Sequence, residues 1–483
     1  MPARNLVAGV DSSTQATKVV VVDADSGQVV ASGQARHTVT GSNGARESDP
    51  RGWWSALREA LAATGRAREI AAISVAGQQH GLVVLDGDGA PLRNALLWND
   101  TRSAPDAERL TERLGARVWA DLTGLRPVAS FTVSKWAWLR RTEPDLAAAV
   151  AAIRLPHDYL TEHLTGRGTT DRGDASGTGW WSSADGQYLD EILSLPEVRL
   201  TPERLPAIVG TAEAAGAVDH AAAAELGLEV GTLVGPGTGD NMAAALGLGL
   251  SSGQAAMSLG TSGTIFAVSD RATADPTGIV AGFADATGRF LPLAATLNCT
   301  QAVDRVAGWL GLDRDDVETT DSVVFLPYLD GERTPNLPSS AGTIVGLRHA
   351  TTRQQILMAA YEGAVASLLT ALDSIAEAVG GLDPKAPLIL VGGGARGRTW
   401  RETVRRLAGQ PIQVPEAAEL VAIGAAAQAT SVLRGELPED VGRRWNKAAG
   451  VLLDALPAEG ERLARIRAVL GAVTAERELS GPR

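Results

Sequence analysis

The sequence predicts a mixed α/β fold made of two domains with related topology. Its 483 residues exceed what a single core usually organises, since domains hold on the order of 150 residues. Strand-like apolar segments alternate with helical patterns along the first half of the chain, as they do in α/β proteins. A strand–turn–strand pattern near the N-terminus returns in the middle of the chain, so we expect each domain to begin with a similar hairpin.

The first hairpin pairs the apolar segment Leu6–Val10 with the β-branched segment Lys18–Val22, and a polar turn at Asp11–Gln15 separates them. A helical pattern with tryptophan and leucine at helical spacing follows from Pro50 to about Ala63. The next strand, Ile70–Ala76, ends at a polar Gln-Gln-His segment between two glycines. These elements predict the core of the first domain.

The second hairpin runs from Ala255 to Ser269 around the turn Gly260–Gly263. Glycine and serine interrupt any regular period at Gly247–Gln254, which indicates a domain boundary there. We therefore expect a first domain at residues 1–250 and a second at 251–435. The remaining residues, 436–483, include a helical pattern at Ala458–Val473 and are expected to pack on the second domain. If the turns of the two hairpins face each other, they enclose a cleft.

Composition excludes several classes of function. The formal net charge is −12 and no dense Lys/Arg cluster occurs, which argues against nucleic acid or an anionic membrane as a partner. No N-terminal signal pattern and no apolar run of the ~18 residues needed to span a bilayer is evident. The single cysteine, Cys299, cannot form an internal disulfide, which fits a cytoplasmic protein. No GxxxxGK[ST] segment occurs, so a bound nucleotide must be held without a P-loop.

Three glycine- or hydroxyl-rich turns are candidates for holding phosphate. Hydroxyl and backbone N–H groups around Asp11 suit phosphate oxygens, and Lys18 lies near enough in sequence to reach them. Asp11 also suits Mg²⁺, a cation that prefers carboxylate and water ligands, although for this residue taken alone a turn aspartate bonding its own backbone is the better explanation. The turn Gly260–Gly263 and the glycine run Gly392–Ala395 at a strand-to-helix junction complete the set, although glycine there also serves backbone geometry alone.

Asp240 lies between a short strand, Thr232–Val234, and an alanine-rich helical segment, Met242–Leu246. Two interpretations fit this position. Asp240 is either an N-cap residue or a general base, kept ionised by the helix dipole, that accepts a hydroxyl proton during phosphoryl transfer. The local pattern leaves both interpretations open.

Two further polar segments at strand ends suit the hydroxyl groups of a polyol. One is Gln78-Gln79-His80 and the other is Trp98-Asn99-Asp100 with Arg102 nearby. A histidine satisfied within the core is an equally good explanation for His80. His157 and His163 do not share a helix face, so no zinc site is predicted.

In this order, the segments resemble the FGGY family of carbohydrate kinases, and within it the members that phosphorylate D-xylulose. The resemblance covers nearly the whole chain. Besides the segments above, it rests on Leu155–Leu160, Asp174–Thr178, Gly239-Asp240-Asn241, Ser258–Gly263, Phe325–Leu329, Gly331–Pro335 and Gly392–Arg396. Each segment alone is weakly specific, whereas the ordered set is strong.

The resemblance implies two actin-like, ribonuclease-H-like domains with an interdomain active-site cleft, MgATP as donor and D-xylulose as acceptor. It implies Asp240 as the catalytic base, Asp11 as the essential aspartate of the phosphate loop, and Gln79, His80 and Asn241 as sugar contacts. The expected nucleotide positions are Thr14, Lys18, Gly260, Thr261, Gly393, Gly394 and Ala395. Two departures stand out: some relatives have methionine at Gln79, and Ser12-Ser13-Thr14 lacks the glycine usual in the first loop.

Two alternatives remain open at this point. One is a kinase for another acceptor, such as ribulose, gluconate or glycerol. The other is a non-catalytic nucleotide-binding protein on the same fold. The oligomeric state is also open, a homodimer included.

Overall fold

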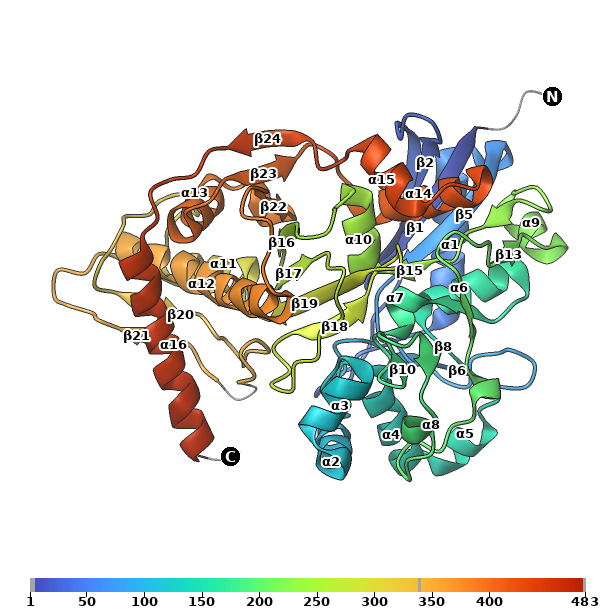
Figure 1. The fold of residues 1–483 in the computed structure, drawn as a ribbon, viewed down its shortest axis with the longest axis horizontal. Coiled ribbons are helices and arrows are strands. Elements are labelled where there is room, and N and C mark those ends of the chain that lie inside the picture. Colours follow the sequence, from blue (N-terminus) through green and yellow to red (C-terminus); the bar gives the residue numbers. More distant parts are fainter. Residues whose placement is uncertain (1–4, 338–339, 481–483) are drawn as a thin grey trace.

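The computed structural model describes residues 5–337 and 340–480, which form two lobes, each built on a seven-stranded mixed sheet (Figure 1). In the first sheet the order is β13-β14-β5-β1-β2-β3, and β15 pairs with the end of β5. The bounds are β1 (Leu6–Ser12), β2 (Ala16–Asp23), β3 (Val29–Arg36), β5 (Ile70–Gly77), β13 (Gly216–Ala217), β14 (Leu233–Val234) and β15 (Thr238–Gly239).

The second sheet has the order β18-β19-β17-β16-β22-β23-β24. Its strands are β16 (Ala255–Leu259), β17 (Gly263–Ala267), β18 (Ala281–Ala284), β19 (Phe290–Thr296), β22 (Leu388–Val391), β23 (Ile412–Pro415) and β24 (Gly450–Leu453). Smaller two-stranded pairs are β4 (Glu47–Ser48) with β7 (Ala95–Leu96), β6 (Val83–Leu85) with β8 (Ala152–Arg154), β9 (Thr169–Asp171) with β12 (Ala207–Val209), β10 (Trp181–Ser182) with β11 (Gln187–Tyr188), and β20 (Val324–Leu326) with β21 (Thr343–Val345).

The predicted repetition of the hairpin is confirmed, and it extends to the neighbouring strands, although β15 and β18 have no counterpart in the other sheet. β1 is antiparallel to β2 and parallel to β5, just as β16 is antiparallel to β17 and parallel to β22. Beyond these, β14 and β23 continue in parallel, and β13 and β24 close the edge antiparallel. Since parallel strands place their carboxyl ends along one edge, the ends of β1 and β5 lie together, as do those of β16 and β22.

Helices cover both sheets. In the first lobe α1 (Pro50–Thr64) packs on β2 and β3, between an Asp49 N-cap and a left-handed Gly65, so the predicted helix is confirmed. The other helices of this lobe are α2 (Ala104–Leu114), α3 (Ala116–Thr123), α4 (Thr132–Thr142), α5 (Pro144–Ala149), α6 (Pro156–Thr165), α7 (Arg172–Ala175), α8 (Asp190–Leu193) and α9 (His220–Leu226). In the second lobe α11 (Thr300–Leu310) and α13 (Arg398–Ala408) pack on α12 (Arg353–Val379).

Helix α12 is the core helix of the second lobe. By length and composition alone, its 27 residues could cross a membrane. This differs from the expectation from the sequence, in which no uninterrupted apolar run of that length is evident. However, 83% of its apolar window is buried, and the helix packs against β17, β19 and β20. It is therefore explained by the protein core.

Two helices tie the lobes together: α10 (Asp240–Leu248) and α14 (Leu420–Arg434). Helix α14 follows the second sheet in the chain but packs on β1 and β5 of the first, so its red ribbon lies beside blue strands (Figure 1). The close approach of α14 to β1 and to α10 requires glycine. A Cβ at Gly9 of β1 would lie 1.8 Å from the Ala422 oxygen, and a Cβ at Gly424 of α14 would lie 1.9 Å from the Ala243 oxygen.

The two C-terminal helices go to different lobes. Helix α15 (Pro438–Trp445) packs on α10 and α14, so the end of the predicted second domain and the start of the predicted tail lie against the first lobe. Helix α16 (Gly460–Ser480) packs on α12, α13 and β20 of the second lobe, as the sequence predicts. The division at 251–435 and 436–483 thus describes the order of the chain rather than two separate bodies in space.

Candidate active site

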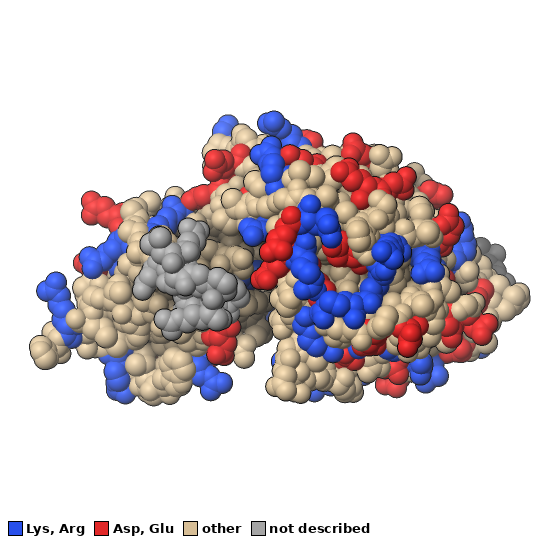
Figure 2. Space-filling model, turned by 90° about the horizontal axis from the view of Figure 1, so that it is seen from below, with Lys and Arg blue, Asp and Glu red and all other residues tan. Residues whose placement is uncertain are grey.

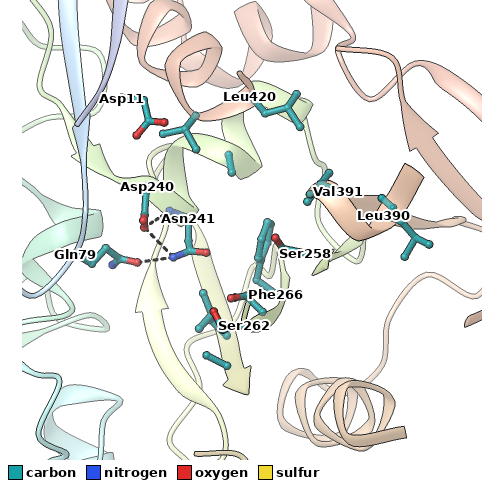
Figure 3. Close-up of a pocket in the computed structure, with 18 of the residues that line it drawn as sticks. Asp11, Gln79, Asp240, Asn241, Ser258, Ser262, Phe266, Leu390, Val391 and Leu420 are labelled. Atoms are coloured by element: carbon teal, nitrogen blue, oxygen red, sulfur yellow. Dashed lines mark hydrogen bonds between the residues drawn. The ribbon is translucent and has the colours of Figure 1, made fainter. Parts of the chain in front are cut away.

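A cavity of about 630 Å³ opens between the two sheets and is lined from both lobes (Figure 3). Space-filling atoms on one face of the molecule show the surface hollowed between the lobes, with acidic and basic side chains interspersed around it (Figure 2). The cavity wall includes most of the side chains that the sequence predicts for the site. These are Asp11, Lys18, Gln79, His80, Asp240, Asn241, Gly393 and Ala395.

Asp240 is the first residue of helix α10, and Gly239 is the N-cap. The N-cap interpretation of Asp240 is therefore wrong. Its Oδ1 instead accepts hydrogen bonds from the backbone N–H and the side-chain amide of Asn241, at 2.8 and 2.9 Å. The amide of Asn241 also donates to Oε1 of Gln79 at 3.0 Å, which joins three of the predicted residues in one chain of hydrogen bonds (Figure 3).

Strand pairing sets this arrangement. Thr238 and Gly239 of β15 pair in parallel with Ala76 and Gly77 at the end of β5, so Asp240 and Gln79 emerge side by side. A Cβ at Gly239 would lie 2.6 Å from the Cγ atom of Gln79, so only glycine lets the two segments approach this closely.

Burial and, to a lesser extent, the nearby carboxylates of Asp11 and Asp174 raise the pKa of Asp240 to about 7, against the opposing effect of the hydrogen bonds from Asn241. The expected effect of the helix dipole does not outweigh this burial. A carboxyl group with a pKa near neutrality is well matched to accept a proton at physiological pH.

Asp11 lies at the end of β1, opposite Lys18 in the hairpin register. Burial raises the pKa of Asp11 to about 7, Lys18 lowers it, and Glu419 raises it. The Lys18 ammonium is paired with Glu419 at 2.8 Å, across the junction between the hairpin and the start of α14. Among the described residues, the buried Oδ1 atom of Asp11 has no hydrogen-bond partner. This oxygen is free to bind a cation.

The donor set at Asp11 fits Mg²⁺ better than a metal caged by the protein. No group of three or more His, Cys, Asp or Glu side chains is arranged to hold a metal in residues 5–337 and 340–480. Mg²⁺ is commonly bound through one or two carboxylates, waters and substrate phosphates, and one unpaired carboxylate oxygen on the cavity wall suits that mode.

His80 follows the end of β5 in a left-handed backbone conformation, with φ of 65°. Its ring packs on Phe131 and Phe283, with centroids 5.1 and 5.5 Å apart. Burial, together with the charges of Lys135 and Arg333, holds the pKa of His80 well below its usual value. His80 is thus a neutral group on the cavity wall, not a satisfied core histidine remote from the site.

A buried ionic cluster supports these strand ends from behind. His157 Nδ1 lies 2.7 Å from Asp174 Oδ2, and His157 Nε2 lies 3.2 Å from Asp158 Oδ1. Burial would lower the pKa of His157, but the carboxylates of Asp158, Asp174 and Asp171 raise it to about 9. The charged ring packs so closely that a Cβ at Gly237 would lie 2.4 Å from its Cδ2 atom. From the sequence, His157 belongs to the Leu155–Leu160 segment of the family resemblance and is excluded as a zinc ligand with His163; its role in this cluster is not predicted, because Asp171 and Asp174 meet it only in the fold.

The opposite end of the cavity is formed by the turn after β22. Gly393 and Ala395, in the 3-10 turn η3 (Gly393–Arg396), line the cavity with Arg396. Gly394 does not, because it lies against β16, where an added Cβ would be 2.8 Å from Cβ of Leu259.

Three other predicted nucleotide positions also lie off the cavity wall: Thr14, Gly260 and Thr261. The Thr14 hydroxyl accepts a hydrogen bond from the Trp98 indole at 3.1 Å, and the Gly260 carbonyl accepts one from the Thr300 hydroxyl at 2.7 Å. From this hairpin the wall instead includes Ser258 and Ser262. Contacts of Thr14, Gly260 and Thr261 with nucleotide stay predictions.

Several residues of the cavity wall are not among the site residues that the sequence predicts. Trp98 stood only in a candidate polyol segment, and Arg333 only in the Gly331–Pro335 segment. Phe266, Phe283 and Glu419 had no local signal, since Glu419 meets Lys18 across a separation of 401 residues.

Comparisons with known proteins agree with this architecture. The model of the FGGY carbohydrate kinase N-terminal domain matches residues 6–247, and that of the C-terminal domain matches residues 255–432. A protein of Streptomyces coelicolor described as xylulose kinase is 62% identical over 467 residues, covering 96% of each chain.

Solved structures are similar over the whole length. The xylulose kinase of Bifidobacterium adolescentis superposes with a TM-score of 0.84 at 36% identity, covering 96% of this chain and 99% of that one. A structure from Brucella ovis described as a xyloylose kinase gives 0.89 at 30% identity, covering 98% and 100%. This chain belongs to the FGGY family of carbohydrate kinases.

Proposed function

We propose that this ATP-dependent carbohydrate kinase transfers the γ-phosphoryl group of ATP to the O5 hydroxyl of D-xylulose, giving D-xylulose 5-phosphate. The observation that supports it most is the Asp240 carboxylate, which lies on the wall of the interlobe cavity and is bonded through Asn241 to Gln79. The relatives described as xylulose kinases support the choice of acceptor.

The two ends of the cavity suit the two substrates. Amide and imidazole groups of Gln79, His80 and Asn241 offer donors and acceptors for sugar hydroxyls, and the Trp98 ring lines the same wall. At the other end, the η3 turn offers backbone N–H groups and little side-chain bulk, which suits the phosphates and ribose of ATP. The acceptor hydroxyl would then lie beside Asp240, between the two.

In the proposed reaction, Asp240 accepts the proton of the O5 hydroxyl as that oxygen attacks the γ-phosphorus and the bond to the β-phosphate oxygen breaks. The products are the sugar phosphate, ADP and a protonated Asp240, which returns its proton to solvent. A base with a pKa near 7 suits this role, because the alcohol loses its proton only as the bond to phosphorus forms.

Asp11 is proposed to bind Mg²⁺ through its unpaired Oδ1 atom, and Lys18 to face the same phosphates. When bound, the metal neutralises charge on the phosphate oxygens. It also offsets the mutual repulsion of the Asp11 and Asp240 carboxylates, which favours the ionised form of the base.

The experiment that tests the proposal is a panel of acceptors assayed with MgATP: D-xylulose, D-ribulose, L-ribulose, gluconate and glycerol. We expect the highest kcat/KM for D-xylulose, measured by coupled ADP release, and no comparable release without acceptor. A higher kcat/KM for another acceptor would overturn the choice of sugar. Binding of ATP with no phosphorylation of any acceptor would overturn the assignment of Asp240 as a base.

The buried, unpaired Cys299 supports our further proposal that the enzyme works in the reducing cytoplasm.

A further inference from the structure

Arg333 contributes the second lobe's guanidinium to the sugar end of the cavity. It lies between β20 and β21, and its side chain lines the cavity with Phe283 and Leu297. Its charge lowers the pKa of His80 and of Lys135, which places it beside the group that we assign to the sugar rather than with the η3 turn.

The neighbouring glutamate, Glu332, acts on Arg333 through its charge but forms no ion pair with the guanidinium. Oε1 of Glu332 accepts hydrogen bonds from the backbone N–H groups of Leu297 and Arg333, and its Oε2 accepts from the backbone and side-chain N–H groups of Asn298. Asn298 also donates to the Gly331 carbonyl at 2.7 Å and accepts from Leu329 N–H at 3.0 Å. These bonds fix the loop and use both oxygens of the carboxylate.

Arg333 lines the cavity, and its guanidinium has no partner in the part of the chain that the structure describes. Within residues 5–337 and 340–480 it makes no hydrogen bond or ion pair. Burial lowers the pKa of Arg333, and the charge of Glu332 opposes this effect only in part. A partly desolvated guanidinium gains most from a ligand oxygen that only accepts hydrogen bonds, since Arg and Lys side chains only donate.

We propose that Arg333 is a specificity-determining residue that donates hydrogen bonds to the carbonyl oxygen of the acceptor ketose. This inference rests on the proposed function, which places the O5 hydroxyl at Asp240 and so directs the carbonyl end of the sugar towards His80 and Arg333. A ketose carbonyl is an acceptor without a hydrogen of its own. A polyol with a hydroxyl in its place brings one more donor to a wall that is already rich in donors, so the enzyme discriminates against it.

The test compares D-xylulose with xylitol and D-arabitol, the two pentitols that reduction of its carbonyl produces. In Arg333→Met we expect kcat/KM for D-xylulose to fall about 10- to 100-fold. The kcat/KM of the pentitols, or their Ki as competitors of D-xylulose where turnover is slow, should change by less than about threefold. The preference of the enzyme for D-xylulose over the pentitols is thus largely lost. Arg333→Lys keeps a single donor group and should recover part of it.

Arg396→Met is the matched control, because Arg396 lines the nucleotide end of the same cavity. It should raise KM for ATP and leave the ratio between D-xylulose and the pentitols as in the wild type. Thermal unfolding and the Kd for ATP, measured on Arg333→Met, check that the fold and the nucleotide end are intact.

Each other outcome overturns the inference in a recognisable way. An equal loss for ketose and pentitols would place Arg333 on the transferred phosphoryl group or in the fold. A retained ketose preference in Arg333→Met, with a wild type active on D-xylulose, would refute the role of Arg333 alone. A wild type inactive on D-xylulose would refute the proposed function together with it.

Discussion

The two lobes share a topology but place different chemistry at the same points. The hairpin β1–β2 ends at Asp11 and Lys18, whereas the equivalent hairpin β16–β17 turns through Gly260–Gly263 without a charged side chain. The parallel neighbour β5 ends in Gln78-Gln79-His80, and its counterpart β22 ends in Gly392-Gly393-Gly394. One lobe thus offers titratable and hydrogen-bonding side chains at its strand ends, and the other offers backbone.

This difference predicts two kinds of sensitivity to mutation. The chemistry of the first lobe depends on the charge state of a few carboxylates, so substitutions that keep shape but remove charge should be severe there. The second lobe depends on close approach of the backbone, so adding a single methyl group should be the damaging change there. Arg333 and Arg396 are exceptions, since each brings a charged side chain from the second lobe.

The largest expected effect is at Asp240. Asp240→Asn keeps the shape of the side chain but cannot accept the proton, so kcat should fall roughly 10²- to 10⁴-fold while the Kd for ATP stays within about threefold. Steady-state kinetics and titration calorimetry measure the two quantities. A kcat near that of the wild type would refute the assignment of Asp240 as the general base.

Asp11 should show the next largest effect, and a different one. Because its Oδ1 atom is the proposed ligand of Mg²⁺, Asp11→Asn should lower kcat/KM for MgATP by about 10²-fold and raise the Mg²⁺ concentration for half-maximal activity. A titration of activity with Mg²⁺ at fixed ATP measures both. An unchanged Mg²⁺ dependence would refute the assignment of Asp11 as a ligand of Mg²⁺.

The two carboxylates also predict a pH dependence. Burial raises the pKa values of Asp11 and Asp240 to about 7, so the base is lost by protonation as pH falls, and kcat/KM for D-xylulose should drop about tenfold per pH unit below 7. Asp11→Asn removes a like charge and should move this limb of the profile to lower pH. Profiles of the wild type and Asp11→Asn measure the difference. Coincident profiles would mean that the two groups do not interact.

The sequence predicted the two hairpins and most of the first lobe's side of the site, because those residues follow directly from strand ends. It could not predict contacts that depend on the crossing of α14, since the helix is apolar and its own pattern does not indicate which sheet it covers. The Lys18–Glu419 pair results from this crossing. Likewise the cluster around His157 includes Asp171 at the end of β9 and Asp174 in α7, and nothing in the spacing of these two residues indicates that they meet the histidine.

The nucleotide positions predicted in the second lobe agree least with the lining of the cavity, for a related reason. A glycine in a turn can either face a ligand or let two segments approach, and its sequence context is the same in both cases. Gly393 and Gly394 are adjacent in one motif, yet only Gly393 lines the cavity. The conformation of the turn, not its composition, decides which of the two faces the cavity.

This pair gives the smallest and most specific prediction. A Cβ at Gly394 would lie 2.8 Å from Cβ of Leu259 and 2.9 Å from Cγ2 of Thr300, whereas a Cβ at Gly393 has no atom within 4 Å. Gly394→Ala should therefore displace η3 from β16, lower Tm by a few degrees and raise KM for ATP about tenfold. Gly393→Ala, the matched control for stability, should leave Tm unchanged, which differential scanning fluorimetry can measure. Equal Tm values for the two variants would mean that the second lobe tolerates side chains as the first does, and that the contrast between side-chain and backbone chemistry does not hold at this turn.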